Sequence, residues 1–203
     1  MNHTMPQSSQ TPRPQPIIDY WIDEVGPKGW YAGTPEIDDA IRDRFEDLWT
    51  RAACGHLDGW LSNPDGSLAY LILTDQFPRN MFRDDHRAFA TDKRALAAAI
   101  KAIHRRWDMR VPEPQRQFFY LPLMHSESQA DQDRCVRLML TRMPESGHIN
   151  MLHARAHRAV IREFGRFPYR NDALGRESTP EEVAYLAAGG YGRTVSDLQA
   201  AAA

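Results

Sequence analysis

Apolar residues recur at steps of three and four along most of this chain, which is the spacing of one face of an α-helix. After Thr34 and Pro35, for example, Ile37, Ile41 and Phe45 follow at this spacing. A threonine cap with proline at the first helical position is a typical helix start. The same signals predict helices over residues 34–55, 65–77, 112–124, 128–143 and 149–164, and further helices that begin at residues 91 and 178.

Two prolines are expected to limit these helices. The residue before a proline is held away from the helical region, so Pro78 should end the second helix at Phe77. Pro122 lies near the end of the strongly apolar helix predicted for residues 112–124, and it should kink or terminate that helix.

The pattern predicts an all-α fold. No window alternates apolar and polar residues with the period of a strand, so we expect no sheet. About seven or eight helices joined by short turns favour antiparallel helical hairpins with TPR-like stacking. Residues 1–16, rich in proline and polar residues, are predicted to be a disordered leader. We expect residues 17–192 to form one helical domain and the alanine-rich residues 193–203 to be a frayed tail.

Composition argues against several classes of function. The formal net charge is −2, which gives no electrostatic basis for binding nucleic acid. No apolar stretch is long enough to span a membrane and the N-terminus does not resemble a signal peptide, so a cytoplasmic protein is expected. Cys54 and Cys135 lie in no metal or redox spacing and are expected to be buried free thiols. No cofactor is predicted, and we expect a monomer or a homodimer.

Two stretches of the chain repeat one motif, Phe-Pro followed by Arg-Asn. The first contains Arg79 and Asn80, and the second, after one additional residue, contains Arg170 and Asn171. In one interpretation each arginine caps helix-end carbonyls and pairs with a local acid, while each asparagine ties its turn. In the other interpretation both guanidinium groups point into a common cavity and bind a carboxylate or a phosphate.

A second candidate lies where Pro122 interrupts the apolar helix. His125, Ser126 and Glu127 follow directly, and a histidine beside a glutamate is a plausible acid/base pair. Ser126 would be a nucleophile only if a base reached its hydroxyl group. The alternative is that Ser126 or Ser128 caps the next helix, with Glu127 in its first turn.

A third candidate is the pair His153 and His157. Histidines four residues apart share a helical face and can bind a metal, but a two-histidine pair needs a further ligand, so no metal site is predicted. His157 could instead complete a polar layer above Arg166. The aromatic pair Trp30 and Tyr31 lies between glycines, where it either covers a pocket or packs against the first helix.

Three of these segments together resemble the bacterial DUF924 family. They are residues 75–80, residues 119–127 and residues 164–171, and the resemblance extends from about Ile17 through Leu186. It implies an all-α, TPR-like fold and supplies no activity or catalytic residues. Tyr169 stands where the family more usually has histidine, and His157, unlike His153, belongs to the family motif.

Two hypotheses for function follow. The first is a pocket that binds a small anionic ligand, and this hypothesis includes catalysis on the bound ligand. Its ligand-binding residues would be Arg79, Asn80, His157, Arg166, Arg170 and Asn171, and its acid/base residues His125 and Glu127. The second is a TPR-like scaffold for protein–protein interaction without catalytic activity, in which the polar motifs pair with one another and leave no cavity.

Overall fold

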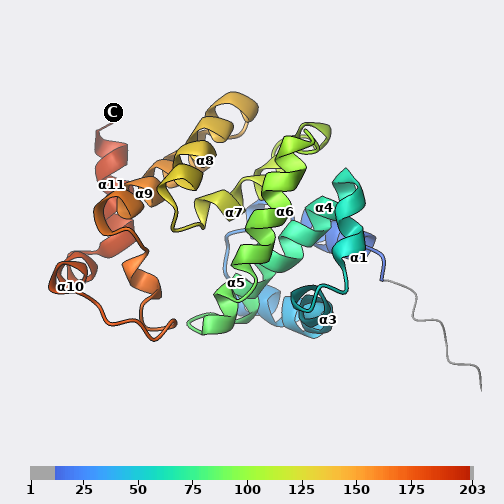
Figure 1. Ribbon diagram of the computed structural model, residues 1–203, viewed down its shortest axis with the longest axis horizontal. Helices are drawn as coiled ribbons and strands as arrows, with labels where there is room; N and C mark the ends of the chain where they lie inside the picture. The colour runs from blue at the N-terminus through green and yellow to red at the C-terminus, as the bar shows by residue number, and fades with distance from the viewer. Residues whose placement is uncertain (1–11, 202–203) are drawn as a thin grey trace, which may run out of the picture.

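The computed structural model describes residues 12–201, which contain helices and no strand (Figure 1). The N-terminal half comprises α1 (Gln15–Ile18), a π-helical segment (Asp19–Val25), α2 (Gly26–Gly29), α3 (Pro35–Ala53), a 3₁₀ turn (Asp58–Ser62), α4 (Pro64–Leu71), a π-helical turn (Ile72–Gln76), α5 (Phe77–Met81), a 3₁₀ turn (His86–Phe89) and α6 (Asp92–His104). The C-terminal half comprises 3₁₀ turns at Asp108–Arg110 and Gln115–Phe119, α7 (Leu121–Met124), α8 (Gln129–Arg142), α9 (His148–Phe164), a 3₁₀ turn (Pro168–Arg170), α10 (Pro180–Ala187) and α11 (Gly190–Ala200). The all-α prediction is confirmed.

Helices whose ends carry a capping signal begin or end close to the predicted positions. Thr34 caps α3 by accepting the Ile37 amide, with Pro35 at the first helical position. Thr179 and Glu182 form a reciprocal capping box at the start of α10, in which each side chain accepts the other residue's backbone N–H. Gly165 ends α9 in the left-handed conformation, which glycine adopts without strain.

Pro78 does not end a helix, and that prediction was wrong. The chain widens into a π-helical turn over Ile72–Gln76, so that the Phe77 amide donates to Ile72 five residues earlier, and α5 then carries Pro78 in its first turn. In a continuous α-helix the ring of Pro78 would clash with the carbonyl four residues earlier, and proline has no N–H to bond to it. The wider π-helical turn removes this clash. The result is a helical path that leads from Asp75 directly to Arg79.

The apolar helix predicted for residues 112–124 is also wrong in detail. It is divided into the 3₁₀ turn Gln115–Phe119 and the single turn α7, and Pro122 stands near the start of α7 instead of near its end. Proline is compatible with the first turn of a helix, where its missing N–H has no intrahelical partner. The following segment, α8, agrees with the prediction for residues 128–143.

The predicted terminal segments need correction. Residues 1–11 of the predicted leader and residues 202–203 lie outside the described residues. Residues 12–16 are held against the fold, since Gln15 opens α1 and the Trp60 indole donates to the Pro12 carbonyl at 2.8 Å. The expected frayed tail is helical as far as Ala200, because α11 packs along α9 and places Tyr191 against it.

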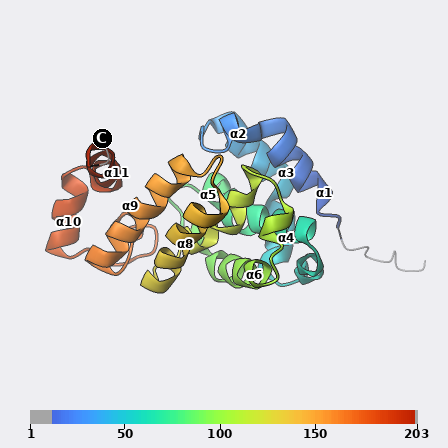
Figure 2. The same ribbon diagram turned by 90° about the horizontal axis from the view of Figure 1, so that it is seen from above.

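The described residues form two apolar clusters. The larger is rich in aromatic side chains, with Trp21, Phe77 and Phe118 packed edge to face. The smaller surrounds Phe167 between α9 and the C-terminal helices. In both views α8 and α9 lie side by side as a helical hairpin, with α10 and α11 beyond them (Figures 1 and 2). TPR-like stacking stays a prediction.

Two sequence expectations about single residues have different outcomes. Cys135 is buried as predicted, but Cys54 is exposed, because it follows the last turn of α3 at the surface. Among residues 12–201 no helix is both long and apolar enough to cross a membrane.

Candidate functional site

The two Phe-Pro-Arg-Asn corners converge on one carboxylate. Arg79 pairs with both oxygens of Asp92 at 3.0 Å, and Arg170 approaches the same carboxylate at 3.4 Å. The corners are not equivalent in backbone, since Arg79 lies in α5 and Arg170 in a 3₁₀ turn after the extended residue Phe167. Arg79 also donates to the Asp75 carbonyl at 2.6 Å, which matches the capping interpretation.

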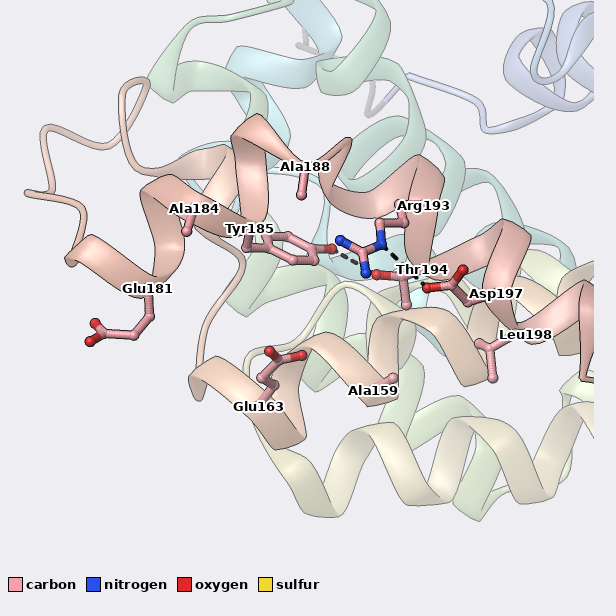
Figure 3. A pocket seen from close by; sticks show the side chains of 10 residues that line it. All are labelled: Ala159, Glu163, Glu181, Ala184, Tyr185, Ala188, Arg193, Thr194, Asp197 and Leu198. Atoms are coloured by element: carbon pink, nitrogen blue, oxygen red, sulfur yellow. Dashed lines mark hydrogen bonds and ion pairs between the residues drawn. The ribbon is translucent and has the colours of Figure 1, made fainter.

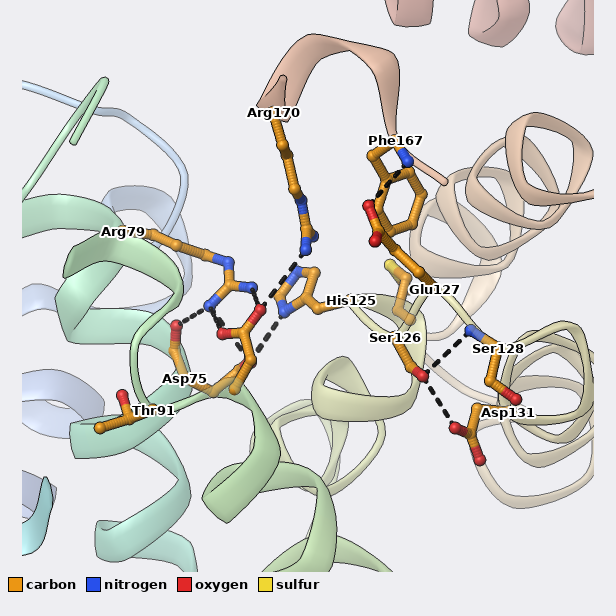
Figure 4. A network of polar contacts seen from close by, with 12 residues as sticks. Asp75, Arg79, Thr91, His125, Ser126, Glu127, Ser128, Asp131, Phe167 and Arg170 are labelled. Atoms are coloured by element: carbon orange, nitrogen blue, oxygen red, sulfur yellow. Dashed lines mark hydrogen bonds and ion pairs between the residues drawn. The ribbon is translucent and has the colours of Figure 1, made fainter. Parts of the chain in front are cut away.

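Asp75 and His125 form a buried pair beside these arginines. The Nδ1 atom of His125 lies 2.9 and 3.0 Å from the two oxygens of Asp75, and Arg79 reaches the same carboxylate at 3.3 Å. Figure 4 shows Arg79, Arg170 and His125 approaching this point from three different segments. The partner of His125 is therefore Asp75, and the predicted pairing of His125 with Glu127 was wrong.

Protonation follows from this arrangement. Burial alone would raise the pKa of Asp75, but its contacts with His125 and Arg79 hold it below its ordinary value. Burial, together with the Arg79 charge, lowers the pKa of His125 although Asp75 opposes the change. An ionised carboxylate can only accept, so Nδ1 of the neutral imidazole carries the proton and Nε2 keeps a lone pair. Among residues 12–201 this Nε2 atom makes no hydrogen bond.

His157 lies next to this pair. Its ring centroid is 6.1 Å from that of His125, and its Nδ1 atom lies 2.9 Å from the His153 carbonyl and 3.1 Å from the Tyr191 hydroxyl. Burial lowers the pKa of His157 to about 3, with a further contribution from His125. Since a carbonyl only accepts, Nδ1 carries the proton of this neutral ring as well.

Arg170 has fewer partners than its burial would suggest. Only 5% of the residue is exposed, its guanidinium lies between the rings of Phe89 (4.7 Å) and Phe167 (4.4 Å), and its Nε atom is buried without a hydrogen-bond partner. Burial and the neighbouring Arg79 lower the pKa of Arg170. A buried guanidinium with unused donors is where an additional acceptor would be stabilised most.

His125 and Arg170 line a cleft of about 510 Å³, called here the main cleft. Arg79 lies instead against a smaller hollow of about 170 Å³, the side hollow, which it shares with Tyr31. Side chains from several segments form the main cleft: Phe89, Asp92, Lys93, Leu96, Pro122, His125, Ser126, Glu127, Ser128, Asp131, Arg170 and Leu174.

Glu127 has a structural partner. Arg176 binds its carboxylate at 2.8 and 3.1 Å, and the Phe167 amide donates to it at 2.9 Å. Burial alone would raise the pKa of Glu127, but Arg176 and this amide hold it below its ordinary value. Glu127 therefore ties the Phe167 corner to the end of α7 and stays ionised. It lies outside the first turn of α8, contrary to the alternative interpretation.

The Ser126 hydroxyl bonds to a carboxylate and to a backbone amide. It donates to Asp131 at 2.8 Å and accepts the Ser128 amide at 3.2 Å, away from His125 (Figure 4). Among residues 12–201 the carboxylate of Asp131 is the one base that bonds to this hydroxyl. The predicted cap is not formed, because Ser128 is the N-cap residue of α8 but its side chain makes no capping bond, and Ser126 accepts only the Ser128 amide, which precedes the helix.

Three predicted ligand-binding residues are used inside the fold. Asn80 is buried and donates to Asp38 at 2.8 Å, away from the histidines. Arg166 binds Glu182 at 2.6 and 2.7 Å. Asn171 donates to the same Glu182 at 3.1 Å, and these bonds brace α10 against the Phe167 corner. The structural interpretation therefore fits these three residues better than a ligand site.

The two histidines of α9 face Tyr191. Its hydroxyl lies 2.7 Å from Nδ1 of His153 and 3.1 Å from Nδ1 of His157, so both nitrogens are occupied. Among the described residues no group of three or more metal-ligating side chains is arranged around a common point.

Sequence reasoning missed the acids that organise the site. The sequence predicted a local acid for each motif arginine, but Asp75 also binds His125, and Arg170 approaches Asp92, which lies 78 residues away in the chain. No short-range signal links His125 to an acid fifty residues earlier in the chain. Asp92 lies in the first turn of α6, the helix predicted to begin at residue 91.

A separate groove of about 710 Å³ lies between α9, α10 and α11 (Figure 3). Glu163, Glu181 and Asp197 line it, and Arg193 pairs with Asp197 at 3.5 Å along α11. It contains none of the predicted site residues.

Comparison with known proteins gives a family and a fold. The family model DUF924, described as a bacterial protein of unknown function, matches residues 17–190. A solved structure from Agrobacterium tumefaciens, also of a protein of unknown function, is similar with a TM-score of 0.79 and 43% identity, covering 85% of this chain and 96% of that one. No functionally curated protein matches the chain significantly.

Proposed function

The chain belongs to the DUF924 family, and from its site we propose that it binds a small anionic ligand beside Arg170 and uses His125 as a general base. The observation that carries this proposal is the placement of two incompletely bonded groups on one cleft. His125, whose Nε2 keeps a lone pair, and Arg170, whose buried Nε has no hydrogen-bond partner among residues 12–201, both line the main cleft.

The geometry supports a proton-transfer step. Asp75 orients the imidazole through Nδ1 and would stabilise the imidazolium that forms when Nε2 takes a proton. A lowered pKa keeps this histidine unprotonated near neutral pH, as a base requires. The proton would come from a hydroxyl group of the ligand or from a water molecule held beside it. The reaction class is therefore base-assisted chemistry on a small acid.

Arg170 would hold the anionic group. Apart from one contact of 3.4 Å with Asp92, its donors are unused among the described residues, and its position between two phenylalanine rings fixes the direction of the guanidinium. Arg79 is already engaged by Asp92 and would act by positioning that carboxylate. The ligand set is thus smaller than the one expected from the sequence.

Titration with inorganic phosphate and with acetate tests this proposal. A bound anion near Arg170 favours the imidazolium form, so the pKa of His125 should rise on saturation, as measured by NMR of the imidazole nitrogens. Arg170→Lys should abolish the rise while the protein stays folded, and Arg155→Gln, an exposed arginine on α9, should retain it. The proposal is lost if neither anion binds to the wild-type protein.

One observation favours the scaffold function as a second candidate. Helix α10 leaves Val183 and Leu186 exposed beside the groove between α9, α10 and α11. Adjacent exposed apolar side chains mark many protein-binding surfaces. Capture of a specific partner that Val183→Asp abolishes, together with no anion binding, would support this candidate over the ligand site.

A further inference from the structure

The main cleft has an apolar wall that the proposed function does not use. Four of the residues that line the cleft have apolar side chains: Phe89, Leu96, Pro122 and Leu174. They come from four segments, which are the 3₁₀ turn before α6, α6 itself, α7 and the loop after the Arg170 corner. Because His125 and Arg170 line the same cleft, a ligand held beside Arg170 shares its cavity with this wall.

The part of the wall that is open to a ligand is mainly aliphatic. Leu174 is 37% exposed, and Leu96 is half-buried on α6. Phe89 is already contacted by guanidinium groups, since Arg170 lies 4.7 Å and Arg79 lies 5.7 Å from the centre of its ring. A ligand that covers the leucine side chains would remove apolar surface from water, which favours binding.

The polar part of the cleft does not favour a second acid group on the ligand. The Asp131 carboxylate accepts the Ser126 hydroxyl and forms no ion pair among residues 12–201. Figure 4 shows both side chains on the side of His125 that faces away from Asp75. A second negative group placed there would be repelled by Asp131. Lys93 lines the same cleft, but it is exposed, so water and salt weaken its attraction.

We propose that the ligand of this site is a short-chain alkyl acid, with one anionic group and a saturated apolar body. This inference rests on the proposed anion site and specifies its substrate class. The acid group binds beside Arg170, and the alkyl chain lies against Leu96, Pro122 and Leu174. Each methylene group of the chain that leaves water on this wall strengthens binding without changing the charge of the ligand.

A series of chain lengths tests the inference. Calorimetric titration of the full-length protein would compare acetate, butanoate, pentanoate and hexanoate. The affinity should rise about two- to fourfold for each additional methylene group. Methoxyacetate has the length of butanoate with an oxygen atom in the chain, and it should bind more weakly than butanoate because burial of that oxygen costs free energy.

Two further ligands test the acid group itself. Butylammonium has the same butyl chain as pentanoate with the opposite charge, and the Arg170 guanidinium should prevent it from binding. Glutarate has the five carbon atoms of pentanoate and a second carboxylate, and it should bind more weakly than pentanoate. Equal or tighter binding of glutarate would show that the ligand carries two acid groups, which contradicts the inference.

Variants assign the chain-length dependence to the apolar wall. Leu174→Ser removes an apolar side chain from an exposed loop and should weaken hexanoate binding about three- to tenfold while acetate binds as before. Leu174→Met keeps an apolar side chain and should retain most of the dependence. Leu186→Ser is the matched control, because Leu186 on α10 is 38% exposed and lies outside the main cleft.

The outcomes separate this inference from the proposed function. If acetate or inorganic phosphate binds and a longer chain adds nothing, the alkyl class is wrong and the anion site stands. If no anion binds, both are wrong. Butylammonium that binds as tightly as pentanoate would also contradict both, because the cleft would then recognise the chain and not the acid. A chain-length dependence that is unchanged in Leu174→Ser overturns the assignment to this wall.

Discussion

Asp75 determines which nitrogen of His125 is available for chemistry. Its ionised carboxylate holds the Nδ1 proton and opposes the fall in the pKa of His125. Asp75→Asn removes that charge, so we expect the pKa of His125 to move further below its ordinary value. NMR titration of the imidazole measures this shift directly. Ser126→Ala, next to His125 but bonded elsewhere, should leave it unchanged, and an unchanged or higher value in Asp75→Asn would contradict the assignment.

His157 makes stability depend on pH. Its pKa is about 3 in the folded protein against an ordinary value of 6.5, so the unfolded chain binds more protons below pH 6.5. The free energy of unfolding should therefore fall as the pH drops from 6.5 towards 3. For this residue the loss between pH 6.5 and pH 5 should be about 1–2 kcal/mol.

Urea denaturation at pH 6.5 and pH 5 measures this contribution. His157→Gln should reduce the difference between the two pH values, while His104→Gln, at an exposed position on α6, should reproduce the wild-type dependence. An equal pH dependence in wild type and His157→Gln would show that another group is responsible.

At the scale of elements, the π-helical turn before α5 positions the acid and the arginine of the site. The Thr74 carbonyl would accept an N–H from residue 78 in an α-helix, but Pro78 has none, and the Thr91 hydroxyl donates to that carbonyl at 2.6 Å. The same hydroxyl accepts the Trp49 indole N–H at 3.1 Å. One side chain therefore satisfies two buried polar groups.

Thr91→Val should destabilise the fold, since it leaves the Thr74 carbonyl and the Trp49 indole buried without partners. We expect a loss of about 2–4 kcal/mol in the free energy of unfolding. Thr91→Ser keeps the hydroxyl and should lose much less. If valine and serine have the same effect in urea denaturation, the hydroxyl bonds are not what stabilises the turn.

The elements that could be predicted from the sequence are those whose ends carry a local signal. Thr34, Thr179 and Gly165 act within a few residues of themselves, so their helices were placed correctly. The path around Pro78 could not be predicted, because its stability depends on Thr91, which comes from another segment. The all-α class could be predicted from the three- and four-residue spacing of apolar residues alone, because every long helix shows that spacing.

The candidate site was predictable only in part, for a related reason. Arg79, Arg170, His125 and His157 were identified from residue type and motif, and they lie close together around Asp75 and Asp92. Asn80, Arg166 and Asn171 have the same residue types and the same motifs, yet they pair inside the fold. Which way a polar side chain points depends on contacts between segments, and the sequence does not display those.

At the scale of the whole molecule, the site forms only when three segments that are far apart in sequence pack together. Asp75 and Arg79 belong to the segment around α5, His125 follows α7, and Arg170 comes from the corner after α9. A ligand that contacts Arg170 and His125 therefore joins segments far apart in sequence, and it stabilises the docked state in proportion to the logarithm of its concentration.

Hydrogen exchange measures this coupling across the molecule. Saturating inorganic phosphate should slow amide exchange together in residues 72–81, 121–128 and 165–171, because each segment holds part of the site or a carboxylate that orients it. The C-terminal half of α11 makes no contact with the main cleft and serves as an internal reference. Protection confined to one of the three segments would mean that the ligand binds elsewhere. Joint protection of all three segments that Arg170→Lys removes would place the ligand where these segments meet.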